Sequence, residues 1–193
     1  MKIDNRNKKL IFAGLGILIV ASISFLGIVE APDQSSNQVS EFNRADLMFM
    51  NMMIIHHDQA IEMAKLADNR TENEKILGLS QNISQTQSEE NQQMSKWLNE
   101  AGFNRPTRGH RMAGMATKQE MNDLRSSRGE EFNLLFSELM IEHHEGGIQM
   151  ARAEVSNGKS EKVIELAQGM IDVQQTEVEK MESWRSKWSR SEQ

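Results

Sequence analysis

The stretch Phe49-Met-Asn-Met-Met-Ile-Ile-His56-His57-Asp-Gln-Ala-Ile-Glu-Met-Ala-Lys65 recurs 87 residues later as Phe136-Ser-Glu-Leu-Met-Ile-Glu-His143-His144-Glu-Gly-Gly-Ile-Gln-Met-Ala-Arg152. The same spacing, without a gap, aligns Glu74 with Glu161 and Trp97 with Trp184. A constant spacing over roughly fifty residues indicates a duplicated unit. Four of the five histidines of the chain lie in this repeat.

Both copies predict helices. Apolar residues recur at helical spacing, and no segment shows the alternation of a strand. Capping boxes at Thr71–Glu74 and Thr117–Glu120 predict helix starts, whereas glycines and Pro106 predict a loop over residues 102–116. We therefore predict an all-α domain over residues 41–190, a four-helix bundle made of duplicated hairpins at about 42–100 and 130–188. One long crossover between hairpins is the ferritin-like connection, and the duplication predicts a pseudo-twofold axis across which the histidine pairs approach.

The first 30 residues form a separate segment. Four basic residues precede an uncharged, mostly apolar run from Leu10 to Val29, which is long enough to span a bilayer as a transmembrane helix. The basic start predicts that the N-terminus lies inside and that the rest of the chain is exported. An uncleaved membrane anchor is favoured over a cleaved signal, which would release a secreted domain. Residues 31–40 are predicted to be a polar tether.

The composition restricts the partners of the exported part. The chain has a net charge of −6, and the acidic excess lies beyond the basic first segment, which argues against a nucleic-acid partner. The chain has no cysteine and 14 methionines, so a soft metal ion would have to be held by methionine and histidine. The sequence does not identify a protein partner.

The histidine pairs are the candidate site for a metal ion. On a helix, residues three, four and seven apart share a face, so each copy can present two imidazoles and two thioethers along one stripe. The alternative is that the methionines fill the core and the histidines are hydrogen-bonded there. The predicted metal-binding residues are His56, His57, Met53 and Met63 in the first copy, and His143, His144, Met140 and Met150 in the second.

Polar residues interrupt the apolar stripe of each partner helix at the same place, at Gln87 and Glu90 and at Gln174 and Glu177. We predict that these side chains face the histidines, where a carboxylate can orient an imidazole or bind the metal directly. The alternative is that they lie at the margin of the stripe and reach solvent. A weaker candidate is the loop sequence around His110, Met112 and Met115, which an ordinary loop explains equally well.

The doubled histidine motif, Gly114-Met115 of the linker and the two Gln-x-x-Glu…Met-x-x-Trp stretches resemble domain-of-unknown-function family 305 over about residues 42–188. The resemblance implies a ferritin-like fold and copper handling, because some relatives are exported copper-binding proteins. One departure stands out: the second motif helix carries Gly146 and Gly147, each of which costs about 1 kcal/mol in helix propensity. Close packing of another helix or a ligand could explain them.

The leading hypothesis is a membrane-anchored, extracytoplasmic protein that binds copper, as Cu(I) or Cu(II), or silver, for buffering or resistance. A second hypothesis is a ferritin-like di-metal oxidoreductase, which needs Glu-x-x-His on two helices. Met53 and Met140 stand where those glutamates would be, so an enzyme is disfavoured. A third is a structural or partner-binding bundle whose histidines are only hydrogen-bonded.

Overall fold

The structure, a computed structural model, describes residues 41–103 and 112–191. Its helices are α1 (Arg44–Leu66), α2 (Glu74–Glu100), α3 (Lys118–Ser126), α4 (Gly129–Asn157) and α5 (Glu161–Ser191), with a 3-10 turn at Ala67–Asn69 after α1. No strand occurs in the described ranges, so the prediction of an all-helical bundle is confirmed.

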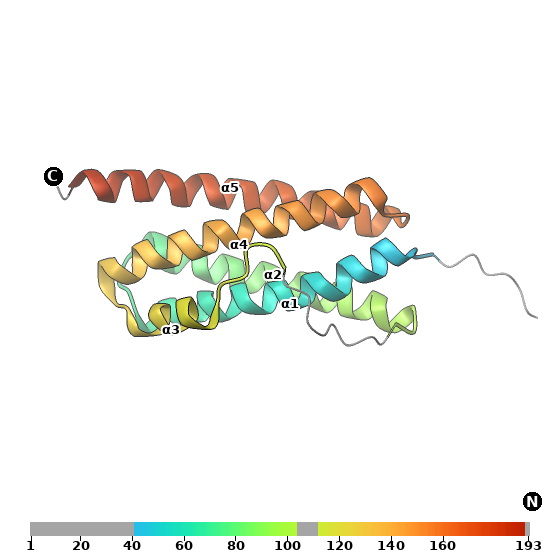
Figure 1. Cartoon of the computed structure of the whole chain (residues 1–193), viewed down its shortest axis with the longest axis horizontal. Helices are drawn as coiled ribbons and strands as arrows, with labels where there is room; N and C mark the ends of the chain where they lie inside the picture. The colour runs from blue at the N-terminus through green and yellow to red at the C-terminus, as the bar shows by residue number, and fades with distance from the viewer. Residues whose placement is uncertain (1–40, 104–111, 192–193) are drawn as a thin grey trace, which may run out of the picture. The chain divides into compact units, whose positions relative to one another are not determined.

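The four long helices form two hairpins, α1 with α2 and α4 with α5, and the hairpins meet mainly through α1 and α4 (Figure 1). The short helix α3 belongs to the linker between the hairpins and packs on both α1 and α4. The chain separates into two units, residues 1–38 and 39–193, and all described elements belong to the second.

The predicted membrane anchor at residues 10–29 and the tether at 31–40 lie outside the described residues. Within residues 41–103 and 112–191, none of the helices combines the length and the apolar character needed to cross a membrane.

Capping side chains fix where the helices begin. Asn43 and Asp46 form a capping box at the start of α1, and the predicted box of Thr117 and Glu120 begins α3. The predicted capping box at Thr71–Glu74 is wrong, because Asn73 caps α2 by accepting hydrogen bonds from the amides of the first turn. The Thr71 hydroxyl instead accepts from the amide of Asn73 at 3.0 Å, which holds the cap in place.

The core divides into two apolar clusters with the histidine pairs between them. Along α1, His56 and His57 separate Met53 of one cluster from Met63 of the other. Along α4, the second pair lies between Met140 and Ala151, which belong to different clusters. The polar centre of the bundle is therefore flanked on both sides by packed apolar side chains.

A buried acid pair joins the start of α1 to the turn between α4 and α5. Asp46 is completely buried and accepts hydrogen bonds from the amides of Lys159 at 2.9 Å and Ser160 at 3.1 Å. Burial raises the pKa of Asp46, but hydrogen bonds with the amide of Asn43, with the Glu154 side chain and with these two amides together lower it below its ordinary value. Glu154 is 2% exposed, and burial together with the neighbouring Asp46 raises the pKa of Glu154 to about 8.

We predict that Glu154 makes stability fall with rising pH. Between its ordinary pKa and about 8, the folded chain holds a proton that the unfolded chain releases. The free energy of unfolding should therefore fall by roughly 1–2 kcal/mol between pH 6.5 and 8. Urea unfolding at both pH values measures this difference. Glu154→Gln cannot ionise and should flatten the pH dependence; an equal slope in both proteins would contradict the assignment to Glu154.

Candidate metal centre

The two histidine pairs meet where α1 crosses α4. The ring centroids of His56 and His143 lie 3.8 Å apart, with the ring planes inclined at 39°. All four histidines are buried, with exposed fractions of at most 1%. The structure thus brings together residues that are far apart in the chain, in the arrangement expected from the duplication.

Three of the four imidazoles have an oxygen acceptor at Nε2. His56 Nε2 lies 3.0 Å from the carbonyl oxygen of Ala113. His57 Nε2 lies 2.8 Å from Glu90 Oε2, and His144 Nε2 lies 2.8 Å from Glu177 Oε2. A carbonyl or an ionised carboxylate can only accept, so each of these nitrogens carries the proton. In the neutral ring, the lone pair is then on Nδ1.

These lone pairs have no hydrogen-bond partner. Within the described part of the chain, Nδ1 of His56, His57 and His144 and Nε2 of His143 are buried and unpartnered. Buried polar atoms in folded proteins are usually paired, and an unpaired one costs about 1–3 kcal/mol. Each of the four imidazoles therefore leaves one buried nitrogen without a partner near the point where α1 crosses α4.

The environment keeps the central histidines neutral. Burial lowers the pKa of His56 to about 4; the hydrogen bond to Ala113 opposes this, and the nearby His57 and His144 add to the lowering. Burial, followed by the proximity of His56, lowers the pKa of His143 well below its ordinary value. Both rings are therefore neutral at pH 7, which is the form that can bind a metal ion.

The two histidine–glutamate couples are related by the repeat but are not equivalent. The Glu90 side chain is 14% exposed, whereas that of Glu177 is 4% exposed. Glu177 also accepts a hydrogen bond at 3.2 Å from Asn82 Nδ2 of α2. The position that corresponds to Asn82 in the second copy is Gly169, which has no side chain to supply such a bond.

The two glutamines lie beside these couples. Gln87 and Gln174 are buried, and among the described residues their Oε1 atoms have no hydrogen-bond partner. Both line a cavity of about 10 Å³ between α2 and α5, together with Glu90 and Glu177. That volume is close to the minimum for one water molecule.

The predicted thioethers do not form one group. Met53 lies in one apolar cluster, with the half-buried Met150 packed against it, whereas Met63 and Met140 lie in the other. Each cluster thus contains one predicted methionine from each copy, because α1 and α4 run antiparallel and cross at the histidines. The structure places two thioethers on each side of the imidazoles.

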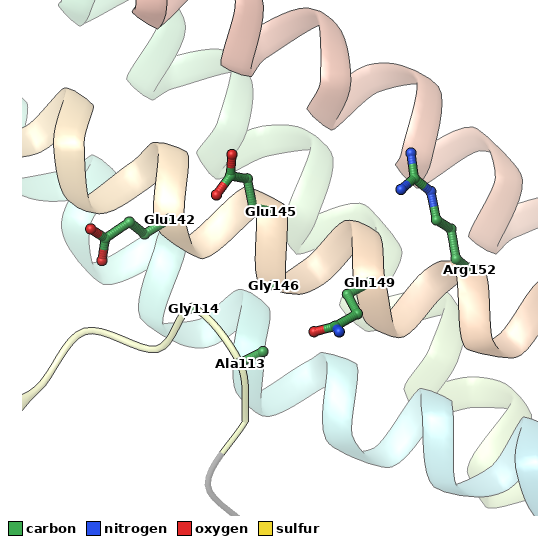
Figure 2. Close-up of a pocket in the computed structure, with 7 residues that line it drawn as sticks. All are labelled: Ala113, Gly114, Glu142, Glu145, Gly146, Gln149 and Arg152. Carbon is green, nitrogen blue, oxygen red and sulfur yellow. The ribbon is translucent and has the colours of Figure 1, made fainter.

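The end of the linker, Met112–Ala116, passes over α1 and α4 (Figures 1 and 2). It meets them at the histidines, because Ala113 contacts His56 and Gly114 lies against the backbone of His143. We call these five residues the strap. Met112 and Met115 of the predicted loop site belong to it and are partly exposed, whereas His110 lies outside the described residues. The strap borders a groove of about 510 Å³ on α4, whose lining includes Glu142 and Glu145 (Figure 2).

The strap explains the two glycines of α4. A Cβ at Gly146 would overlap the carbonyl group of Ala113, with the carbonyl carbon only 2.5 Å away. A Cβ at Gly147 would lie 2.6 Å from Gln174 Oε1, which is the end of a flexible side chain. Close packing therefore accounts for both departures from helix propensity, and the strict requirement is at Gly146.

Sequence reasoning did not identify Gln59 or Ala113 as parts of the site. Ala113 acts through its backbone carbonyl, which leaves no signature in a side-chain pattern. Gln59 binds the backbone of Ala116 and looks like an ordinary polar residue of a helix surface. Its only signal is that the repeat has glycine, Gly146, at the same position.

A sequence profile described as Domain of unknown function (DUF305) matches residues 46–185. No curated protein sequence matches this chain. Several solved structures do. A DUF305 protein from Streptomyces coelicolor, provisionally described as secreted, is 33% identical, with a TM-score of 0.68 over 71% of this chain and 89% of that one.

A DUF305 fragment from Deinococcus radiodurans is 26% identical, with a TM-score of 0.70 over 76% of this chain and 98% of the fragment. A protein named CopM, solved in a Cu(I)-bound form, is 28% identical, with a TM-score of 0.64 over 74% of this chain and 96% of CopM. CopM has also been solved in Cu(II)-bound, silver-bound and metal-free forms.

Proposed function

This chain belongs to the DUF305 family, and it is similar to CopM, which has been solved with copper or silver bound; we propose that its helical bundle binds copper or silver ions at the paired histidines. The observation that carries the proposal is the set of four buried, unpartnered imidazole nitrogens on His56, His57, His143 and His144. An ion held between imidazoles of the two helices would accept electron pairs from some of these nitrogens.

The chemistry of the donors favours a soft ion. Neutral imidazole and thioether suit Cu(I) and Ag(I), and imidazole with carboxylate suits Cu(II). Among the described residues, no three histidine, aspartate or glutamate side chains are placed to hold one ion together. We therefore propose a set in which imidazoles from both helices are completed by thioethers, drawn from Met53, Met63, Met140 and Met150.

Glu90 and Glu177 are proposed to orient their histidines rather than to bind the ion. Each accepts from Nε2 of its imidazole at 2.8 Å, which fixes the ring and leaves Nδ1 free. A carboxylate in this position also makes the imidazole a stronger donor. The same geometry supports ferritin-like bundle packing, in which facing helices direct polar side chains toward the centre.

The test is a competitive titration of the purified, untagged protein with Cu(I), Cu(II) and Ag(I), each measured separately. Tight binding of at least one ion supports the proposal, and failure to compete with a weak chelator for all three refutes it.

Within that experiment, we predict that Glu90→Gln and Glu177→Gln each lower the affinity about 10–100-fold while the melting temperature changes little, because glutamine keeps the shape and removes the charge. Unchanged titrations for both variants would show that the carboxylates do not support the site.

We also propose that the domain works outside the cytoplasm, held to the membrane through residues 10–29. The support is the basic start and apolar run of the sequence, together with the provisionally secreted relative from Streptomyces coelicolor. Fractionation of cells, followed by protease treatment of intact cells, distinguishes an anchored exported domain from a released or internal one.

A further inference from the structure

The strap, Met112–Ala116, is fastened to α1 at two places. The Ala113 carbonyl accepts from His56 Nε2 at 3.0 Å, so the strap directly contacts a ring of the candidate site. Three residues further along α1, the Gln59 side chain donates to the Ala116 carbonyl at 2.9 Å and accepts from the Ala116 amide at 2.7 Å. Gln59 therefore clamps one strap residue through both of its backbone groups.

The strap also lies directly on the backbone of α4. Gly114 has a left-handed φ of 74°, and a Cβ there would lie 3.0 Å from both the Glu142 carbonyl carbon and the His143 Cα. Gly146 leaves the space that the Ala113 carbonyl occupies. Because neither side has room for a Cβ, the strap covers the helix at the histidine pair without an intervening layer of side chains (Figure 2).

The repeat shows which residues have adapted to the strap. Gln59 and Gly146 occupy the same position in the two copies, three residues after the first histidine of each pair. The strap crosses the duplicated site once, so one copy provides a clamp and the other provides space. The histidines themselves are identical in both copies.

We propose that Gln59 is a positioning residue that holds the strap closed over the histidines, and that ions enter and leave the site when the strap lifts. This inference rests on the proposed ion site. Lifting breaks the hydrogen bond from His56 Nε2 to Ala113 and opens the side of the site that borders the α4 groove. The groove is lined by the carboxylates of Glu142 and Glu145 and by one cation, Arg152, so its net negative charge favours the approach of a cation.

The first measurement is hydrogen exchange of the Ala116 amide in the metal-free full-length protein. Gln59→Ala removes both clamp bonds, so exchange should become roughly 10–100-fold faster, given about 0.5–1.5 kcal/mol per bond. Gln59→Glu keeps the acceptor for the Ala116 amide and loses the donor to its carbonyl, so its exchange should be intermediate. Gln92→Ala, at an exposed glutamine of α2, is the matched control and should exchange as the parent does.

The second measurement is the rate at which the loaded protein releases Cu(I) or Ag(I) to an excess of chelator. Gln59→Ala should release the ion roughly 10-fold faster or more, and Gln59→Glu should fall between it and the parent. If the Ala116 amide exchanges faster in Gln59→Ala but the ion is released at the parent rate, the inference is overturned. The small cavity between α2 and α5 would then be the remaining route for the ion. Unchanged exchange would overturn the clamp itself.

Failure of the underlying ion site gives a different result. A parent protein that takes up no ion refutes the proposed function, whereas the exchange comparison still decides whether Gln59 clamps the strap. A protein that binds the ion tightly and shows no difference between Gln59→Ala and Gln92→Ala in either measurement retains the ion site and refutes the strap as its gate.

Discussion

Replacing His56, His57, His143 and His144 with alanine is expected to abolish tight binding of copper and silver. The variant loses all four unpartnered imidazole nitrogens at the helix crossing, and the remaining thioethers lie in two separate clusters. Removing every imidazole from a site of this kind should lower the affinity by at least about 1,000-fold, because a single supporting residue is already worth roughly 10–100-fold. The competitive titration described above measures the loss.

The controls separate loss of the site from loss of the fold. Four alanines leave cavities in a packed core, so circular dichroism must show that the helices remain. If the quadruple variant unfolds, the double variant His56→Gln and His143→Gln, which keeps most of the side-chain volume, carries the test. Replacing Met112 and Met115 with leucine should weaken binding only modestly. A folded variant without these histidines that binds as the parent does would refute the assignment.

Gly146→Ala is expected to destabilise the protein, although alanine favours a helix by about 1 kcal/mol over glycine. The new Cβ would overlap the Ala113 carbonyl, and a backbone group cannot move away without displacing the strap. Overpacking of this kind costs about 1–3 kcal/mol, so we expect a net loss of stability and a lower melting temperature.

The neighbouring glycine is the matched control. Gly147→Ala brings its Cβ to 2.6 Å from Gln174 Oε1, which can rotate away, and position 60 of the first copy already carries alanine. Its stability should stay near that of the parent or rise slightly. Equal melting temperatures for Gly146→Ala and Gly147→Ala would mean that the strap moves freely and that its backbone contact with α4 has no cost.

The helix order and the meeting of the histidine pairs could be predicted because they depend on periodicity and duplication. Glu90 and Glu177 were identifiable because a charged residue in an apolar stripe needs a partner. The split of the methionines into two clusters was not predictable, since periodicity shows which face a residue is on and not which residue of the opposite helix it meets. Met53 and Met63 share a face of α1 but lie on opposite sides of the crossing point.

Contacts made by backbone atoms were the hardest to predict from the sequence. The strap depends on carbonyl and amide groups of Ala113 and Ala116, which every residue type has. The acid pair of Asp46 and Glu154 was also missed, because Asp46 satisfies the pattern of a helix cap and Glu154 lies among ordinary polar residues. Their contact depends on the start of α1 meeting the turn after α4, which local patterns do not contain.

The hydrogen bond from Asn82 to Glu177 makes the duplicated halves chemically unlike. Glu177 accepts hydrogen bonds from both His144 and Asn82, whereas Glu90, among the described residues, accepts one from His57 alone, because Gly169 stands in place of Asn82. A carboxylate that already accepts a second hydrogen bond polarises its imidazole less. We therefore expect His144 to be a weaker electron-pair donor than His57, and an ion bound at the crossing to lie nearer to His57 on α1 than to His144 on α4.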